Sequence, residues 1–131
     1  MDADKPTHAI WNPVFRREDE RGTFCEVLNG TDRWATLTHG RMRAGAVMGN
    51  HYHQRTTVFF YLLEGRATVV VKALASGERQ QFELGPEQGL LLHPMQSHVI
   101  RYEANSTFVL MKDRPYDPSA PDTYHHPVEE S

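Results

Sequence analysis

The 131-residue chain has a mass of 15.0 kDa, which is enough for one domain with a single core and excludes a two-domain enzyme. Lysine and arginine total 14 against 17 aspartates and glutamates, so the net charge of −3 provides no basic excess to bind nucleic acid or an anionic membrane. The apolar runs are too short to span a bilayer and the single cysteine, Cys25, cannot form an internal disulfide, so we expect a cytoplasmic protein.

Short runs of β-branched and aromatic residues follow one another along the chain, each bounded by Gly, Pro, Asn or Asp, and no long stretch has helical spacing. They predict strands at residues 24–28, 34–42, 46–53, 58–63, 67–74, 79–84, 89–93, 98–102 and 107–112. Ser76 and Gly77 predict a tight turn that makes the strands on either side antiparallel neighbours. The regular, short spacing predicts an all-β sandwich or jelly roll.

Two of the predicted strands are apolar on both faces, at residues 58–63 and 67–71, so each is expected to be covered on both sides by a second sheet or another subunit. The ends of the chain differ from this pattern. Residues 1–9 are polar, and residues 115–131 contain four prolines among acidic and histidine residues. We therefore expect a single domain over residues 1–131, with an extended C-terminal arm that packs on the barrel or on a partner subunit.

Histidine is over-represented, with eight residues in a short chain, and the most informative pair is His51 and His53. Residues two apart on a strand project from the same face, so both imidazoles can approach one ion. His98 can lie opposite them in an antiparallel sandwich. Three neutral imidazoles suit zinc, iron, copper or nickel and leave positions open for water or substrate. The alternative is that His51 and His53 face solvent or form local hydrogen bonds.

Three segments, at residues 45–53, 59–65 and 89–98, resemble the two sequence motifs of the cupin superfamily in order and spacing. This resemblance implies a cupin jelly roll, also called a double-stranded β-helix. It also implies a metal site of three histidines and one glutamate inside the barrel.

The sequence departs from the family pattern at Val58, which stands where the cupin motif has its glutamate ligand. Because valine cannot coordinate a metal, the complete four-ligand set is excluded. A three-histidine site remains, and water, His93 or Gln54 can complete it.

A closer resemblance runs from about residue 17 to residue 128. Residues 19–26 (DERGTFCE) are similar to a segment of the nucleotide-sugar epimerase cupins. Residues 48–53 (MGNHYH) and 116–124 (YDPSAPDTY) resemble the C-terminal cupin domain of the bifunctional capsular polysaccharide enzymes, which epimerise a UDP-4-keto-sugar at C3. The resemblance implies epimerisation or ketoisomerisation of a nucleotide-linked 4-keto-sugar, with His51 as the general base.

Removing a proton next to a ketone requires a base and a group that stabilises the enolate oxygen. His51 can be the base, or it can join His53 and His98 in holding a metal that stabilises the enolate. A ligating His51 has its lone pair occupied, so the two mechanisms compete. If His51 is a ligand, another group is the base, and Tyr61 and Glu26 are candidates by position. No organic cofactor is expected.

Substrate-binding candidates follow from the same segments. Arg21 can bind a pyrophosphate with its planar guanidinium, or it can be a surface residue of a turn. Arg55 is a weaker candidate of the same kind. Phe24 is a further candidate for contact with the substrate, although we expect it, like Trp34, to belong to the core.

Residues 54–57 lack the lysine and glutamate expected of the sugar epimerases, and Val58 makes the pocket more apolar. Two other functions are therefore compatible with the sequence. One is a metal-dependent oxygenase or cyclase acting on a polyketide or aromatic substrate, and the other is a cupin that binds a small molecule without catalysis. In each case we expect a homodimer formed by strand exchange or edge pairing.

Overall fold

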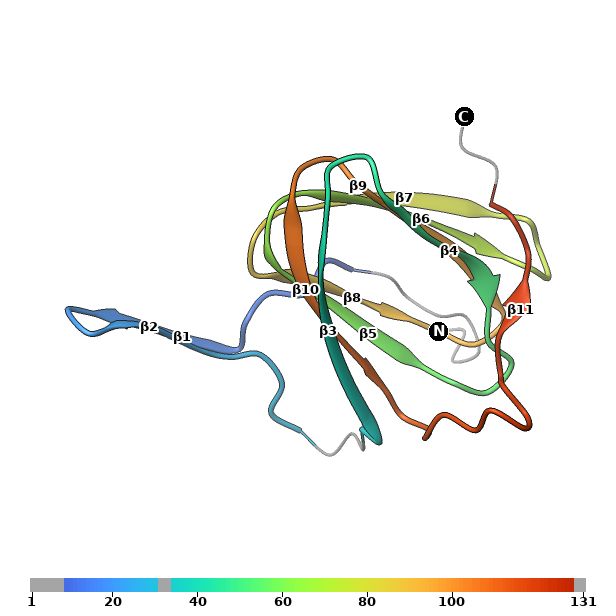
Figure 1. The fold of residues 1–131 in the computed structure, drawn as a ribbon, viewed down its shortest axis with the longest axis horizontal. Coiled ribbons are helices and arrows are strands. Elements are labelled where there is room, and N and C mark those ends of the chain that lie inside the picture. The colour runs from blue at the N-terminus through green and yellow to red at the C-terminus, as the bar shows by residue number, and fades with distance from the viewer. Residues whose placement is uncertain (1–8, 31–33, 129–131) are drawn as a thin grey trace.

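The computed structural model describes residues 9–30 and 34–128, and within these residues every strand pairing is antiparallel and no helix occurs. It follows that the described residues hold no helix long and apolar enough to cross a membrane. Two sheets face each other (Figure 1). The first sheet has four strands, in the order β3 (Thr36–Met42), β10 (Ser106–Lys112), β5 (Val58–Glu64) and β8 (Gln88–Leu92). The second has five, in the order β11 (Tyr124–His125), β4 (Val47–Tyr52), β9 (Gln96–Tyr102), β6 (Ala67–Ala73) and β7 (Arg79–Leu84).

The core lies between the two sheets and is filled by alternate side chains of their inner strands. Val58, Phe60 and Leu62 of β5 meet residues of β6 and β9 there, each with at most 2% of its surface exposed. The other face of β5 is covered as well, because the rings of Trp11 and Trp34 contact Phe59 at centroid distances of 5.8 and 6.2 Å. This two-sided cover explains why the sequence of β5 is apolar at consecutive positions.

The predicted hairpin around Ser76 and Gly77 is confirmed. β6 and β7 pair from Ala67 opposite Leu84 to Lys72 opposite Arg79. Gly77 has a φ of 75°, in the left-handed region that glycine enters without strain.

A separate hairpin, formed by β1 (Phe15–Asp19) and β2 (Gly22–Glu26), projects from the sandwich (Figure 1). The sequence predicted one strand here, at residues 24–28, and missed β1. Phe24 is 54% exposed, so the expectation that it belongs to the core is wrong. The reason is that β2 pairs only with β1 and lies outside both sheets, where Phe24 contacts the ring of Phe15 and the guanidinium of Arg17.

The C-terminal arm packs on its own sandwich. Its two-residue strand β11 pairs with the edge strand β4, placing Tyr124 opposite Tyr52 and His125 opposite His51. The two tyrosine rings stack at 5.2 Å. Val128 is 6% exposed and packs against Val70 and Val99 on the outer face of the five-stranded sheet. The predicted arm is therefore a strap across β4.

Candidate functional site

Three imidazoles converge at one end of the sandwich. His51 lies on β4, His53 follows the end of that strand, and His98 lies on β9, directly opposite His51. One ring nitrogen of each histidine lies within 4.8 Å of the corresponding nitrogens of the other two. His53 and His98 are buried, with 4% and 5% of their surface exposed, whereas His51 is half-buried.

An irregularity in β4 sets the position of His51. The pairing register between β4 and β9 shifts between Gly49 and His51, and both Gly49 and Asn50 have positive φ, at 106° and 60°. A Cβ atom on Gly49 would lie 2.6 Å from the carbonyl oxygen of His98, which is too close for any other residue. The glycine therefore permits the local twist that brings His51 next to His98.

The three imidazoles border a cavity of about 520 Å³ between the sheets, which we call the histidine chamber. Its wall is largely apolar, with side chains of Met48, Val58, Ile100, Phe108 and Leu110. Lys112 and Tyr116 border it at the side of the C-terminal arm. Val58 faces this chamber, so the position that would carry the cupin glutamate is an apolar part of its wall.

Burial keeps the three imidazoles neutral at pH 7. It lowers the pKa of His51 to about 4 and that of His98 to about 3, and the pKa of His53 is lowered as well. His53 lowers the pKa of His51 further, and His51 and His53 both lower that of His98. The positive charge of Lys112 acts in the same direction on all three. Each histidine therefore offers a lone pair, as a metal ligand or as a base.

Hydrogen bonding orients His53. Its Nδ1 lies 2.5 Å from the backbone carbonyl of Asp122, and because a carbonyl only accepts, Nδ1 carries the proton. The Nε2 atom of His53 consequently keeps its lone pair. The Nδ1 of His98 is buried and has no hydrogen-bond partner among the described residues.

The cluster fits a transition metal in its donor set. Tetrahedral zinc with Zn–N bonds of about 2.0–2.1 Å needs nitrogens roughly 3.3 Å apart, and small ring rotations would bring nitrogens within 4.8 Å to that spacing. The unpartnered Nδ1 of His98 is further support, because a buried polar atom without a partner is costly. Among the described residues no carboxylate joins the cluster, so a metal would have three protein ligands and at least one open position.

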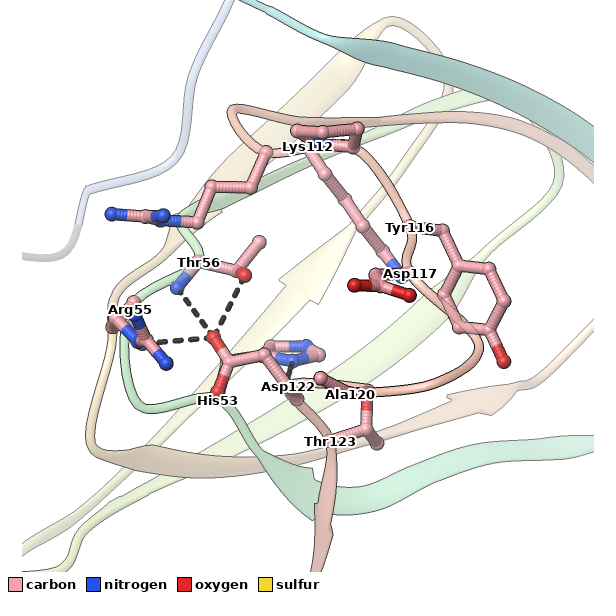
Figure 2. Close-up of a pocket in the computed structure, with 11 residues that line it drawn as sticks. His53, Arg55, Thr56, Lys112, Tyr116, Asp117, Ala120, Asp122 and Thr123 are labelled. Carbon is pink, nitrogen blue, oxygen red and sulfur yellow. Dashed lines mark hydrogen bonds between the residues drawn. The ribbon is translucent and has the colours of Figure 1, made fainter.

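A second hollow of about 230 Å³ adjoins the histidine chamber and shares His53, Lys112 and Tyr116 with it. We call it the cationic mouth, because Arg55 and Arg114 line it together with Lys112. Figure 2 shows Arg55, Lys112, Tyr116, Asp117 and Asp122 arranged around this hollow, with His53 behind Asp122. The C-terminal arm and the loop after β4 form its walls.

Asp122 fastens the arm to the loop after β4. Its carboxylate accepts hydrogen bonds of 2.9–3.0 Å from the backbone N–H groups of Gln54, Arg55 and Thr56 and from the hydroxyl of Thr56. Figure 2 shows the bonds from Arg55 and Thr56. Partial burial opposes ionisation of this carboxyl, but the four hydrogen bonds together outweigh it and lower its pKa to about 2. The same residue orients His53 through its backbone carbonyl. Asp122 therefore both connects the arm to the loop after β4 and positions an imidazole.

Acid is expected to weaken this fastening. The folded-state pKa of Asp122 is about 2, below its ordinary 3.8, so the stabilisation is complete well above pH 3.8 and is lost as the pH falls toward about 2. Urea unfolding between about pH 5 and pH 2 should show the free energy of unfolding falling more steeply for the natural protein than for Asp122→Asn. If the free energy of unfolding falls equally with pH in the natural protein and in Asp122→Asn, the Asp122 carboxylate does not stabilise the fold through these hydrogen bonds.

Tyr61 does not reach the histidine chamber within one copy of the chain. Side chains alternate along β5, so Tyr61 lies on the opposite face from Val58, Phe60 and Leu62. Its ring stacks on Phe59, and its hydroxyl is buried with no hydrogen-bond partner among the described residues. Burial raises the pKa of this hydroxyl to about 12, which disfavours the phenolate form that a base would need.

The other candidates divide between the projecting hairpin and the mouth. Arg21, Phe24 and Glu26 lie on the β1–β2 hairpin, and none of them borders the histidine chamber of the same copy. Figure 1 shows this hairpin projecting from the sandwich. Arg21 forms a 2.7 Å ion pair with Asp19 in the hairpin turn, and Glu26 accepts a hydrogen bond from Asn29. Arg55, in contrast, borders the cationic mouth.

Three residues of the site were missed in the sequence. Lys112 ends β10 and Arg114 follows two residues later, and nothing in their neighbourhood sets either apart from an ordinary surface cation. Asp122 stands in the 116–124 segment that carried the resemblance to the capsular polysaccharide enzymes. That match marked the segment, but only the fold shows that the carboxylate bonds to the loop after His53.

Similar structures share this fold at low sequence identity. CapF from Staphylococcus aureus, a capsular polysaccharide assembling protein, superposes with a TM-score of 0.68 at 21% identity over 88% of this chain. This chain spans only 33% of the CapF chain. The dTDP-4-dehydrorhamnose 3,5-epimerase of Sulfolobus tokodaii superposes with a TM-score of 0.75 at 20% identity, covering 86% of this chain and 73% of the epimerase.

A third similar structure is that of a double mutant of the QdtA 3,4-ketoisomerase from Thermoanaerobacterium thermosaccharolyticum, solved in complex with TDP. It has a TM-score of 0.71 and 16% identity, covering 91% of this chain and 87% of the ketoisomerase. At these identities the superpositions show the fold alone, which is that of the cupin jelly roll.

Family membership rests on the sequence itself. No curated protein sequence is significantly similar to the chain. Residues 17–124, which are most of the chain, match the family described as the polysaccharide biosynthesis C-terminal domain. The chain, an all-β cupin jelly roll, therefore belongs to the polysaccharide biosynthesis C-terminal domain family.

Proposed function

We propose that the protein epimerises or ketoisomerises a nucleotide-linked 4-keto-sugar by moving protons next to the ketone. The observation that carries this proposal is the cluster of three neutral imidazoles in a largely apolar chamber with Lys112 at its side. Neutral imidazoles accept protons, and a nearby ammonium favours the negative charge that a deprotonated ketone develops. Family membership and the epimerase and ketoisomerase folds support the same class of reaction.

The chemistry requires no oxidant or reductant. A neutral imidazole takes the proton from the carbon next to the ketone, and the electron pair of that C–H bond moves to form an enolate. In epimerisation a proton derived from solvent is added to the same carbon from the opposite face, and the imidazolium releases the removed proton to solvent. In ketoisomerisation protons move between neighbouring carbon and oxygen atoms, so the carbonyl shifts by one position. In both reactions Lys112 is the fixed cation beside the chamber that can stabilise the enolate oxygen.

His51 is the first candidate for the base, because it is the least buried of the three imidazoles and lines the chamber. The same three histidines could hold a divalent zinc, iron or nickel ion, which when bound would polarise the substrate ketone. His51 would then be a ligand, and another group would have to accept the proton.

The function is tested by solvent exchange. The protein is incubated in deuterium oxide with a panel of nucleotide-linked 4-keto-sugars, and the carbons next to the ketone are followed by NMR. Catalytic deuterium incorporation with at least one substrate is the expected result. Absence of incorporation across the panel at protein concentrations equal to substrate would refute the proposal.

Elemental analysis decides between the two roles of His51. If the three-histidine site binds metal, untagged protein should contain nearly one metal per subunit, and His51→Ala and His98→Ala should each lose it. A His125→Ala/His126→Ala double variant controls for binding by histidines of the arm and should keep the metal. Folded protein that stays free of metal after addition of zinc or iron would leave His51 as the base.

A metal-dependent oxygenase or cyclase is the second candidate, favoured by the apolar wall of the chamber and by the absence of a carboxylate from the described cluster. Oxygen consumption that requires added Fe(II), with a polyketide or aromatic substrate, would support it.

We further propose that the protein is a homodimer joined through the β1–β2 hairpin. Val14, Phe15 and Phe24 are each about half exposed on or next to this hairpin, and a second copy would cover them. In such a dimer Arg21 and Phe24 could contact the substrate of the partner. Light scattering should give a molar mass of about twice the 15.0 kDa subunit, and Phe24→Ser should shift the protein toward the monomer. A monomeric natural protein would contradict this arrangement.

A further inference from the structure

Three cationic side chains line the cationic mouth, namely those of Arg55, Lys112 and Arg114. Within residues 9–30 and 34–128, none of the three takes part in an ion pair, whereas Arg16, Arg17, Arg21 and Arg101 all do. Arg55 and Arg114 are exposed, and Lys112 is half-buried on the chamber side. The mouth therefore presents cations that no described carboxylate contacts.

The two carboxylates in the same wall are occupied elsewhere. Asp122 accepts four hydrogen bonds from the loop after β4. Asp117 accepts hydrogen bonds from the backbone N–H and the hydroxyl of Ser119, both within its own turn. Three positive charges thus face two negative ones, and neither carboxylate forms an ion pair with Arg55, Lys112 or Arg114. The guanidinium groups are therefore available to an external anion.

The position of the mouth relates such an anion to the imidazoles. His53, Lys112 and Tyr116 border both the mouth and the histidine chamber, so the two hollows adjoin. The mouth is the more polar of the two, and the chamber is walled mainly by apolar side chains. A molecule with an anionic group at one end and a carbonyl ring at the other matches this order of surfaces.

We propose that the cationic mouth binds the phosphate or diphosphate group of the substrate through Arg55 and Arg114, and so directs the attached ring into the histidine chamber. This inference rests on the proposed function, since it names where the charged part of that substrate lies. Arg55 and Arg114 then take the place of Arg21 as the main contacts for the anion. Within one copy of the chain, Arg21 forms an ion pair with Asp19. The planar, forked donors of arginine suit phosphate oxygens better than a single ammonium does.

Calorimetric titration tests this assignment with three probes: inorganic pyrophosphate, TDP and thymidine. TDP and thymidine share the nucleoside, so their difference isolates the diphosphate, and pyrophosphate alone represents an anion without a nucleoside. The variants are Arg55→Gln and Arg114→Gln, which keep the backbone N–H groups that hold Asp122. Arg79→Gln is the matched control, because it removes an exposed arginine on β7 that borders neither hollow.

Binding of TDP should be at least about tenfold tighter than binding of thymidine, and should weaken as salt is added. Arg55→Gln and Arg114→Gln should each weaken the binding of TDP and of pyrophosphate by about fivefold to twentyfold. Arg79→Gln should leave both affinities unchanged. The assignment would be overturned if TDP and thymidine bound equally tightly or if neither pyrophosphate nor TDP bound. It would also be overturned if Arg55→Gln and Arg114→Gln bound both anions as tightly as the natural protein does.

The titration also separates this inference from the proposed function. Anion binding that depends on Arg55 and Arg114, without deuterium exchange in any 4-keto-sugar, would leave the mouth as a binding site and refute the reaction. If Arg55→Gln and Arg114→Gln leave deuterium exchange unaffected at substrate concentrations well below saturation, the reaction is supported and the mouth is refuted. TDP binding that thymidine matches and pyrophosphate lacks would place the affinity in the nucleoside and refute the mouth.

Discussion

Replacing His51 with asparagine is expected to reduce deuterium exchange into the 4-keto-sugar by about 10³-fold. The imidazole is neutral at pH 7 because burial lowers its pKa to about 4, so it can accept a proton or bind a metal. An amide is not a base at this pH and is a poorer ligand for a transition metal than imidazole. The initial rate of exchange, measured by NMR under saturating substrate, gives the effect. Since His51 is half-buried, the variant should fold, which circular dichroism can verify.

The matched control is His125→Asn. His125 lies directly opposite His51 in the pairing of β11 with β4, but it is exposed and borders neither hollow. Exchange should continue at nearly the natural rate in this variant. If His51→Asn retains most of the exchange activity, the histidine chamber is not where the proton is transferred.

Replacing Asp122 with alanine is expected to lower the melting temperature by about 10 °C. The variant loses a carboxylate that accepts four hydrogen bonds, three of them from backbone groups of the loop after β4. A loss of about 3 kcal/mol is reasonable for such a set, and in a chain of this size it corresponds to a shift of that order. Thermal unfolding followed by circular dichroism measures the change.

Asp117→Asn is the control for this loss. Asp117 lies in the same arm, but its carboxylate accepts hydrogen bonds only within its own turn, from Ser119 and from the backbone N–H of Ala120. The cost should therefore stay below about 1 kcal/mol. Equal melting temperatures for the two variants would show that Asp122 does not fasten the arm to the barrel.

Local patterns in the sequence were sufficient for much of the sandwich. Within the run at 67–71, three valines follow one another at residues 69–71, because β6 is covered by β5 on one side and by Val128 on the other. The alternation rule placed His51 and His53 on one side of β4, and the spacing of the cupin motifs pointed to His98. These signals succeed because they depend on residues close together in the chain or on spacing within a known motif.

The rest of the site depends on contacts between distant segments. Lys112 and Asp122 meet His53 only because β10 and the arm return to the end of β4. Neither residue has a periodic pattern that reports this return. The prediction that Phe24 belongs to the core was wrong for a related reason. An aromatic residue in a strand has the sequence pattern of a core position even when its strand lies in a separate hairpin.

The pairing of β11 with β4 has a consequence for self-association. Without β11, strand β4 would be an open edge of the five-stranded sheet and would present unpaired N–H and C=O groups to other molecules. Such edges nucleate intermolecular β-sheets and then aggregates. At protein concentrations well above those used for circular dichroism, a variant whose arm detaches on warming, as expected for Asp122→Ala, should therefore aggregate before its core unfolds. Turbidity should then rise ahead of the change in tyrosine and tryptophan fluorescence.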